Sequence, residues 1–212
     1  VVSGAGNVAQ YAVQKATALG AKVISVSDSN GYIIDKDGID FDLLVDVKVK
    51  RRARLTEYAA ERASATYHEG SVWTYDGTFD IALPCATQNE IDGEAAKRLV
   101  AQGVFCVSEG ANMPSNLDAI AVYKEHNLLY GPAKAANAGG VAVSALEMSQ
   151  NSLRLSWTRE EVDTRLKDIM TNIFNTAKTT AENYNLGKDY LAGANIAAFE
   201  NVANAMIAQG IV

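Results

Sequence analysis

The stretch at residues 1–9, Val-Val-Ser-Gly-Ala-Gly-Asn-Val-Ala, decides the expected fold. A short β-branched run leads into a Gly-x-Gly-x-x-Ala pattern, and an alanine-rich stretch follows as far as Gly20, which predicts a strand, a tight turn and a helix. Gly4 permits the turn, Gly6 lets a pyrophosphate approach the backbone, and Ala9 lets the helix pack closely. Because the first N–H groups of a helix are unpaired and lie at its positive end, a phosphate is the expected guest.

A second strand supports this interpretation. Residues 22–27 read as a strand that ends at Asp28, 22 residues after Gly6. An acid at this point of a dinucleotide-binding fold holds a ribose hydroxyl. The alternative is a glycine-rich turn in a fold that binds no nucleotide. Only three residues precede Gly4, so we expect the chain to start late in its first strand, as a piece of a longer protein.

Composition narrows the class of protein. The 212 residues are 48% hydrophobic and 21% charged, typical of a soluble globular protein with one large core, or one core plus a small appendage. A net charge of −6 argues against nucleic acid and anionic membranes as partners. Two cysteines form no disulfide framework and two histidines form no metal cluster. We therefore expect a cytoplasmic protein with no membrane partner and no metal.

Strand and helix patterns alternate along the first part of the chain, which predicts a parallel sheet with helices on both faces. Residues 29–40 suggest a small hairpin, and residues 42–63 are helical in character with a basic middle. The expected later elements are strands at 79–83, 104–107 and 128–130 and helices at 93–102, 116–126, 141–153, from 159 and at 194–209.

The predicted fold is thus an α/β class, a Rossmann-type doubly wound and mostly parallel sheet with an all-helical C-terminal extension. We expect residues 1–150 to form the dinucleotide-binding domain, with its first strand truncated. Residues 151–212 would form the helical extension, packed on the same unit.

Loops that follow the predicted strands share a composition of small and amide-bearing residues. Ligands of such sheets bind beyond the carboxyl ends of the strands. Small residues allow close backbone approach to a flat ligand, and amides supply donors and acceptors for its carboxamide and hydroxyls. Taken singly, each loop is better explained by ordinary turn preferences, but all of them together at the same edge of the sheet are not. These loops are residues 4–8, 28–29, 85–89, 109–114 and 134–141.

Four motifs carry a resemblance to a known family: Ser-Gly-Ala-Gly-Asn-Val-Ala at 3–9, Pro-Cys-Ala-Thr-Gln-Asn-Glu at 84–90, Glu-Gly-Ala-Asn-Met-Pro at 109–114 and Ala-Ala-Asn-Ala-Gly-Gly-Val at 135–141. In this order, over essentially the whole chain, they resemble the cofactor domain of hexameric glutamate dehydrogenases, most closely the NADP-dependent branch. The resemblance implies a homo-hexameric parent whose N-terminal domain, absent here, binds substrate and builds the hexamer. It also implies reversible oxidative deamination of L-glutamate to 2-oxoglutarate and ammonia, with hydride transfer at the amino-acid Cα.

The resemblance also implies roles for individual residues. The family's catalytic lysine and aspartate belong to the absent domain, so this chain is expected to hold no catalytic residue and to be inactive alone. Val141 and Ser144 would contribute to the substrate pocket, with the Ser144 hydroxyl on the side-chain carboxylate of glutamate. The implied cofactor-binding residues are Gly4, Gly6, Asn7, Val8, Ala86, Thr87, Gln88, Asn112 and Asn137.

The choice between NADP and NAD depends on the tip of the second strand. Asp28 alone suggests NAD, because a free 2′-hydroxyl prefers a lone acid. Ser29 and the basic segment from Lys48 to Arg54 suggest NADP, and Ser29, Lys48 and Arg54 match positions of the family's phosphate-recognition set. We favour NADP. The alternative for the basic run is a solvated helix face balanced by acidic neighbours.

Three other functions remain open. A related leucine, phenylalanine or valine dehydrogenase has a similar cofactor domain, although Ser144 suits a side-chain carboxylate. An NAD-dependent glutamate dehydrogenase is a second alternative, and a non-catalytic nucleotide-binding or interaction module is a third. Cys85 has no histidine at a spacing that suggests a nucleophile, so we interpret it as a structural thiol.

Overall fold

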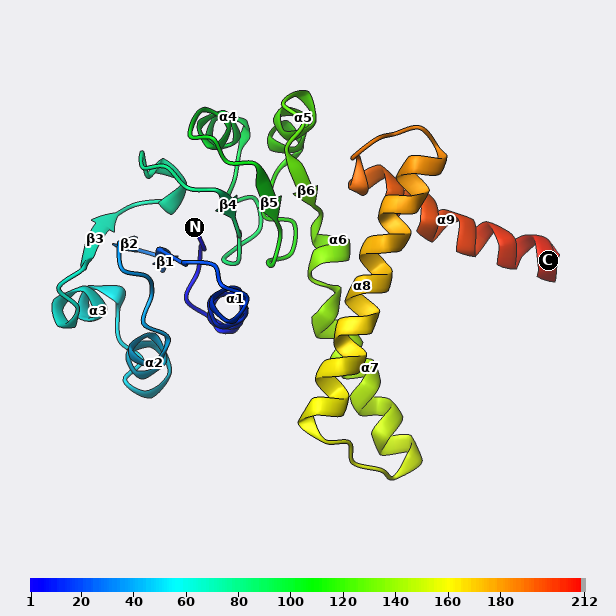
Figure 1. The fold of residues 1–212 in the computed structure, drawn as a ribbon, viewed down its shortest axis with the longest axis horizontal. Coiled ribbons are helices and arrows are strands. Elements are labelled where there is room, and N and C mark those ends of the chain that lie inside the picture. Colours follow the sequence, from blue (N-terminus) through cyan, green and yellow to red (C-terminus); the bar gives the residue numbers. More distant parts are fainter. Residues whose placement is uncertain (211–212) are drawn as a thin grey trace. The chain divides into compact units, whose positions relative to one another are not determined.

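The computed structural model describes residues 1–210, and the last two residues of the expected helical extension lie outside this range. The chain packs as two units that divide between Leu129 and Tyr130 (Figure 1). The first unit contains α1 (Asn7–Ala18), β1 (Ser25–Ser27), β2 (Gly31–Asp35), α2 (Phe41–Val45), the π-helix η1 (Asp46–Lys50), α3 (Leu55–Glu61), β3 (Ala65–Glu69), the 3-10 helix η2 (Val72–Thr74), β4 (Ile81–Ala82), α4 (Gly93–Ala101), β5 (Cys106–Ser108) and α5 (Leu117–Glu125), and reaches the start of β6 (Leu129–Gly131).

Two three-stranded sheets, β1-β2-β3 and β4-β5-β6, flank the first residues of the chain. Val2 forms a parallel bridge with Leu83, and the Leu83 N–H donates to the Val1 carbonyl at 2.8 Å. On the other side, the Ser25 hydroxyl bonds both the N–H and the carbonyl of Val2 at 2.9 Å. The first four residues therefore lie between β1 and β4, and this position makes them the central strand of the unit.

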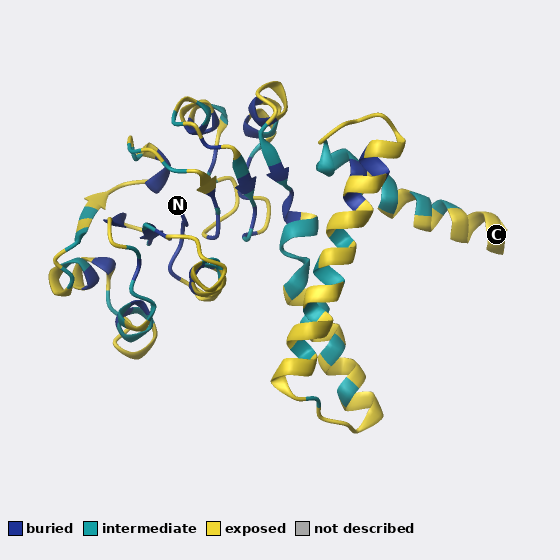
Figure 2. Ribbon diagram, in the orientation of Figure 1, coloured by how far each residue is buried: buried dark blue, intermediate teal, exposed yellow. Residues whose placement is uncertain are grey.

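Helices cover both sides of these strands. Figure 1 shows α4 and α5 on the opposite side from α1. Ala9 is fully buried, as the close packing of α1 requires, and with Val2, Val13, Val26 and Leu44 it belongs to the main core. In Figure 2 the buried residues of this unit follow the strands and the inner sides of the helices. The α/β class predicted from the sequence is confirmed.

The β1-β2-β3 sheet departs from the expected parallel arrangement. Both of its pairings are antiparallel, and β3 was not predicted. The short connection at Asp28–Asn30 explains the β1–β2 pairing, because two strands joined by so few residues can pair only antiparallel. The predicted helical stretch at 42–63 is also interrupted: α2 and η1 end before residues 51–54, which link them to α3.

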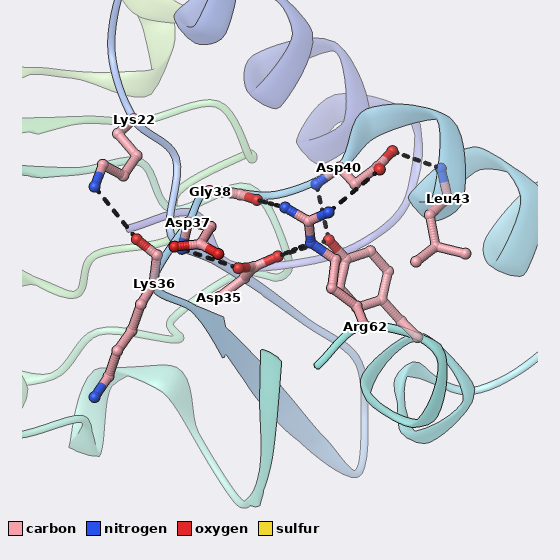
Figure 3. Close-up of polar contacts among 9 residues, drawn as sticks. Lys22, Asp35, Lys36, Asp37, Gly38, Asp40, Leu43 and Arg62 are labelled. Carbon is pink, nitrogen blue, oxygen red and sulfur yellow. Dashed lines mark hydrogen bonds and ion pairs between the residues drawn. The ribbon is translucent and has the colours of Figure 1, made fainter. Parts of the chain in front are cut away.

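A buried carboxylate holds α3 against β2 (Figure 3). Asp35 is fully buried and accepts hydrogen bonds from the Tyr58 hydroxyl at 3.1 Å, the Asp37 N–H at 3.1 Å and the Arg62 guanidinium. Arg62 also donates to the Gly38 carbonyl at 3.0 Å. Burial by itself would raise the pKa of Asp35, but hydrogen bonds from Ser64, Arg62, the Asp37 N–H and Tyr58 outweigh it and lower the pKa.

The second unit is helical and contains α6 (Ala133–Ala136), α7 (Ala138–Leu153), α8 (Arg159–Asn183) and α9 (Tyr190–Gln209). A capping box formed by Thr158 and Glu161 begins α8, at the position expected from the sequence for a helix starting at 159. Where α8 and α9 cross, a Cβ on Gly193 would lie 2.0 Å from the Ala177 carbonyl oxygen, so this crossing requires glycine. Figure 2 shows the buried patch at this crossing. Among residues 1–210, no helix has the length and apolar character needed to cross a membrane.

Replacing Asp35 with Asn should lower the free energy of unfolding by about 3 kcal/mol at neutral pH, because Arg62 then loses its fully buried partner and keeps only the more distant Asp40 carboxylate, at 3.5 Å. The folded pKa is lower than the unfolded value of about 3.9, so the stabilisation is complete above that value and is lost as the pH falls through the folded pKa. Urea unfolding from neutral pH down to about pH 3 measures both effects.

Asp76→Asn changes an exposed carboxylate and is the matched control, expected to leave the stability curve unchanged. Equal stability of Asp35→Asn and the parent chain at neutral pH would contradict the role assigned to this carboxylate.

Candidate functional site

The glycine-rich turn leads directly into the N-terminus of α1. Gly4 has a φ of +83°, and a Cβ there would lie 2.8 Å from the Cys85 carbonyl oxygen. Gly6 is the N-cap residue of α1, and no side chain caps the first N–H groups of this helix. A Cβ added to Gly6 would meet no heavy atom within 4 Å. Gly6, Asn7 and Val8 are exposed. The positive end of the helix thus faces open space, where an anion can approach the backbone.

Asp28 follows β1, beside this turn, and its carboxylate is 8% exposed. One oxygen accepts from the Asn30 N–H at 3.0 Å, and the other accepts from the Leu55 N–H at 3.2 Å, at the start of α3. The Lys48 ammonium lies 3.7 Å away. Burial alone would raise the pKa of Asp28, but these two N–H groups, the charge of Lys48 and the Gly31 backbone hold the pKa below its ordinary value.

Donors gather around this carboxylate. The Arg54 guanidinium donates to the Ser29 hydroxyl at 2.8 Å and lies 4.0 Å from Asp28. Lys48 also donates to the Ala53 carbonyl at 2.8 Å, which fixes its side chain. The structure therefore brings together Asp28, Ser29, Lys48 and Arg54, which come from three separate segments. Ser29 and Arg54 are the exposed members of this group, which we call the strand-tip cluster.

Other cations of the basic run point elsewhere. Arg51 bonds Asp46 at 2.9 Å, Glu57 at 3.2 Å and Glu61 at 2.6 Å. Lys50 lies 3.3 Å from Asp46. For these two residues the alternative of a solvated, charge-balanced face is correct, whereas Lys48 and Arg54 turn toward Asp28.

Two loops continue the site on the other side of the glycine-rich turn. Ala86, Thr87 and Gln88 follow the strand region that ends at Pro84, and all three are exposed. The N–H groups of Gly110 and Ala111 both donate to the Pro84 carbonyl at 3.0 Å, which ties the two loops together. Asn112 is exposed beside Met113, which has a φ of +48°.

Cys85 is buried beneath these loops, where a Cβ on Gly110 would lie 2.6 Å from its Sγ. Burial, with a smaller contribution from the charge of Glu90, raises the pKa of the Cys85 thiol to about 12. A thiol with such a pKa stays protonated at neutral pH, which agrees with a structural role.

Among residues 1–210, no cluster of three metal-ligating side chains is present.

The remaining predicted site residues belong to the second unit. Asn137 is half-buried and is the N-cap residue of α7. Val141 and Ser144 are exposed and lie three residues apart, so they share one face of α7. The Ser144 hydroxyl donates to the Gly140 carbonyl at 3.3 Å within the helix.

Sequence reasoning missed one residue of this region. The Glu90 carboxylate accepts from the N–H groups of Ala86 and Thr87 at 3.0 and 3.2 Å, and from the Trp73 indole at 2.8 Å. Glu90 closes the quoted motif at 84–90, but no spacing rule links it to Trp73, so only the folded chain shows this contact.

Comparisons with known proteins agree with one another. The model of a family described as Glutamate/Leucine/Phenylalanine/Valine dehydrogenase matches residues 1–210. An NADP-specific glutamate dehydrogenase of Giardia intestinalis is 51% identical over 100% of this chain and 48% of that protein. An NAD(P)-specific glutamate dehydrogenase of Xylanibacter ruminicola is 52% identical over the same shares of the two chains. The chain thus spans about half the length of the curated relatives it matches.

A solved structure gives the same result in three dimensions. The crystal structure of Plasmodium falciparum glutamate dehydrogenase superposes with a TM-score of 0.94 at 47% identity, covering 100% of this chain and 46% of that one.

The two glycines of the turn should respond differently to an added methyl group. Gly4→Ala should lower the free energy of unfolding by about 2–3 kcal/mol, because alanine is strained at this positive φ and its Cβ meets the Cys85 carbonyl. Gly6→Ala should cost no more than about 1 kcal/mol, the usual difference at an N-cap. Chemical denaturation of both variants measures this, and equal losses would refute the assignment.

Proposed function

Since the chain belongs to the glutamate/leucine/phenylalanine/valine dehydrogenase family, whose model matches residues 1–210, we propose that it is the cofactor-binding part of an NADP-dependent glutamate dehydrogenase. The family resemblance inferred from the four motifs is confirmed. Because the chain spans about half of its relatives' length, the activity and the partners of the whole protein are part of this proposal.

One observation carries the choice of NADP. The carboxylate of Asp28 is already occupied by the N–H groups of Asn30 and Leu55 and by Lys48. Its side chain is also only 8% exposed, which leaves a ribose hydroxyl little room to reach it. The exposed groups of the strand-tip cluster that can donate are instead the Arg54 guanidinium and the Ser29 hydroxyl, which now accepts from Arg54 and donates to the exposed Asn30 side chain at 3.2 Å. Donors of this kind suit a 2′-phosphate.

The rest of the first unit fits the other parts of the cofactor. The open N-terminus of α1, with Gly4, Gly6, Asn7 and Val8, would hold the pyrophosphate. The exposed loop residues Ala86, Thr87, Gln88 and Asn112 would line the half of the cofactor beyond the turn, and Asn137 would lie near the nicotinamide carboxamide.

The proposed reaction is the reversible conversion of L-glutamate, NADP⁺ and water to 2-oxoglutarate, ammonia and NADPH. The nicotinamide, when bound, exchanges a hydride with the amino-acid Cα. This chain would hold the cofactor in position, and the exposed face of α7 that bears Val141 and Ser144 would contribute to the substrate pocket. The catalytic lysine and aspartate would come from another domain.

Other parts of the proposal concern organisation. We keep residues 1–150 as the proposed cofactor domain and residues 151–212 as its helical extension, although α7 (Ala138–Leu153) crosses this boundary and the second compact unit starts at Tyr130. A homo-hexamer is the assembly implied by the resemblance. A cytoplasmic location is supported by the two cysteines, Cys85 and Cys106, which are both free.

Calorimetric titration at low salt should show tighter binding of NADPH than of NADH by at least about tenfold, the value of one charge-assisted hydrogen bond. Lys48→Ala or Ser29→Ala should reduce this preference, while binding of NADH changes little. Arg51→Ala is the matched control, because that cation is paired with acidic residues outside the strand-tip cluster. A preference for NADH would make Asp28 the ribose ligand and overturn the NADP assignment.

The 212-residue chain alone should not turn over glutamate. Its proposed role is to hold the cofactor, whereas the proton transfers at the amino group need the catalytic residues of another domain. Absorbance of the reduced nicotinamide, followed with NADP⁺ and L-glutamate, measures this. Turnover by the isolated chain would show that the reacting groups lie within it.

A further inference from the structure

Three hydrogen-bond donors converge on the carboxylate of Glu90. Its Oε1 accepts from the backbone N–H groups of Ala86 at 3.0 Å and Thr87 at 3.2 Å. Its Oε2 accepts from the indole Nε1 of Trp73 at 2.8 Å. Glu90 is half-buried, so its charge depends on these donors for compensation. The carboxylate therefore joins an exposed loop to one particular ring.

The Trp73 indole ring is held firmly within the first unit. Trp73 is 2% exposed, and its carbonyl accepts from Arg98 of α4 at 3.4 Å. The chain on either side of Glu90 is also held, because the N–H groups of Asn89 and Ile91 donate to the carbonyls of Met113 and Pro114 at 2.9 Å. The loop that contains Ala86 and Thr87 is otherwise exposed, so Glu90 gives its backbone a rigid attachment.

The loop that contains Ala86 and Thr87 lies next to the glycine-rich turn, so its shape affects the proposed cofactor site. A Cβ on Gly4 would lie 3.1 Å from the Ala86 Cα, so the loop adjoins the turn. The strand-tip cluster adjoins the same turn from the other side, where the Ser27 hydroxyl accepts from the Gly4 N–H at 2.7 Å. A dinucleotide with its phosphorylated adenosine at the cluster and its pyrophosphate on α1 would place its other half over the loop.

We infer that Glu90 is a positioning residue, which sets the conformation of residues 86–88 so that this loop receives the nicotinamide half of the cofactor. The inference rests on the proposed function. It assigns Glu90 no contact with the cofactor, because its two oxygens face the loop backbone and Trp73. The adenosine half, bound at the strand-tip cluster, does not depend on it.

A carboxylate is specifically required here. An amide at this position has one oxygen, so its NH₂ group must face a donor, either the Trp73 indole or the loop N–H groups. Glu90→Gln should therefore loosen the loop although the side chain keeps its size. Trp73→Phe removes the indole donor, so the double variant Glu90→Gln/Trp73→Phe should bind no more weakly than Glu90→Gln alone.

The experiment compares two probes on the full natural chain that carries these residues, NADPH and adenosine 2′,5′-bisphosphate, which contains only the adenosine half. Glu90→Gln should raise the Kd for NADPH by about tenfold and leave the Kd for the bisphosphate within about twofold. Glu94→Gln, a change of an exposed carboxylate in the first turn of α4, is the matched control and should alter neither Kd.

The remaining outcomes separate the inference from the proposed function. Unchanged NADPH binding in Glu90→Gln would overturn the positioning role. Equal weakening of both probes, together with a lower Tm, would also overturn it, because Glu90 would then support the unit as a whole. Failure of the unmodified chain to bind NADPH would instead overturn the proposed function.

Discussion

The arrangement of the first unit depends on the pairing of its first four residues with two neighbours. On one side the Leu83 N–H and carbonyl bond Val1 and Ser3. On the other side the hydroxyls of Ser25 and Ser27 bond Val2 and Gly4. A central strand buried on both faces must satisfy its backbone groups in this way, since an unpaired buried N–H or carbonyl is costly. This pairing places the glycine-rich turn between the strand-tip cluster and the loop at 86–88.

The charge that the strand-tip cluster presents to solvent is set by the contacts of the Asp28 carboxylate. A carboxylate next to the turn is expected to hold a ribose, but here the same carboxylate caps α3 and holds Lys48. The acid thus organises the cluster whose outer surface presents donors. Asp35 plays a comparable part on β2, where it binds Tyr58 and Arg62 of the segment that begins with α3. Two acids therefore fix both ends of α3, and α3 presents Arg54 at its N-cap.

On the opposite side of the glycine-rich turn, Glu90 also uses a carboxylate to hold a loop in place. There a carboxylate with three donors ties the loop at 86–88 to the buried Trp73. At Asp28, Asp35 and Glu90 alike, a negative charge is compensated by at least one backbone N–H group together with at least one side-chain donor or cation. Such charge-assisted bonds are stronger than neutral ones, which suits loops that must keep a defined shape at the surface.

The local sequence determined the elements whose cause is local. The positive φ at Gly4, the close packing of Ala9, the capping of α4 by Asp92 and the capping box at Thr158 all follow from residue types at fixed spacings. The order of strands and helices, and with it the α/β class, followed from the same patterns. The four short motifs were sufficient to indicate the family.

Only the tertiary structure decided the relations between distant segments. The sequence offered Asp28 as a ribose ligand and a run of cations as one group, whereas the fold occupies Asp28 and turns only Lys48 and Arg54 toward it. The antiparallel β3 and the contact between Trp73 and Glu90 were likewise beyond prediction. The reason is physical: strand pairing and the direction of a long side chain depend on neighbours that folding supplies, and no spacing along the chain records them.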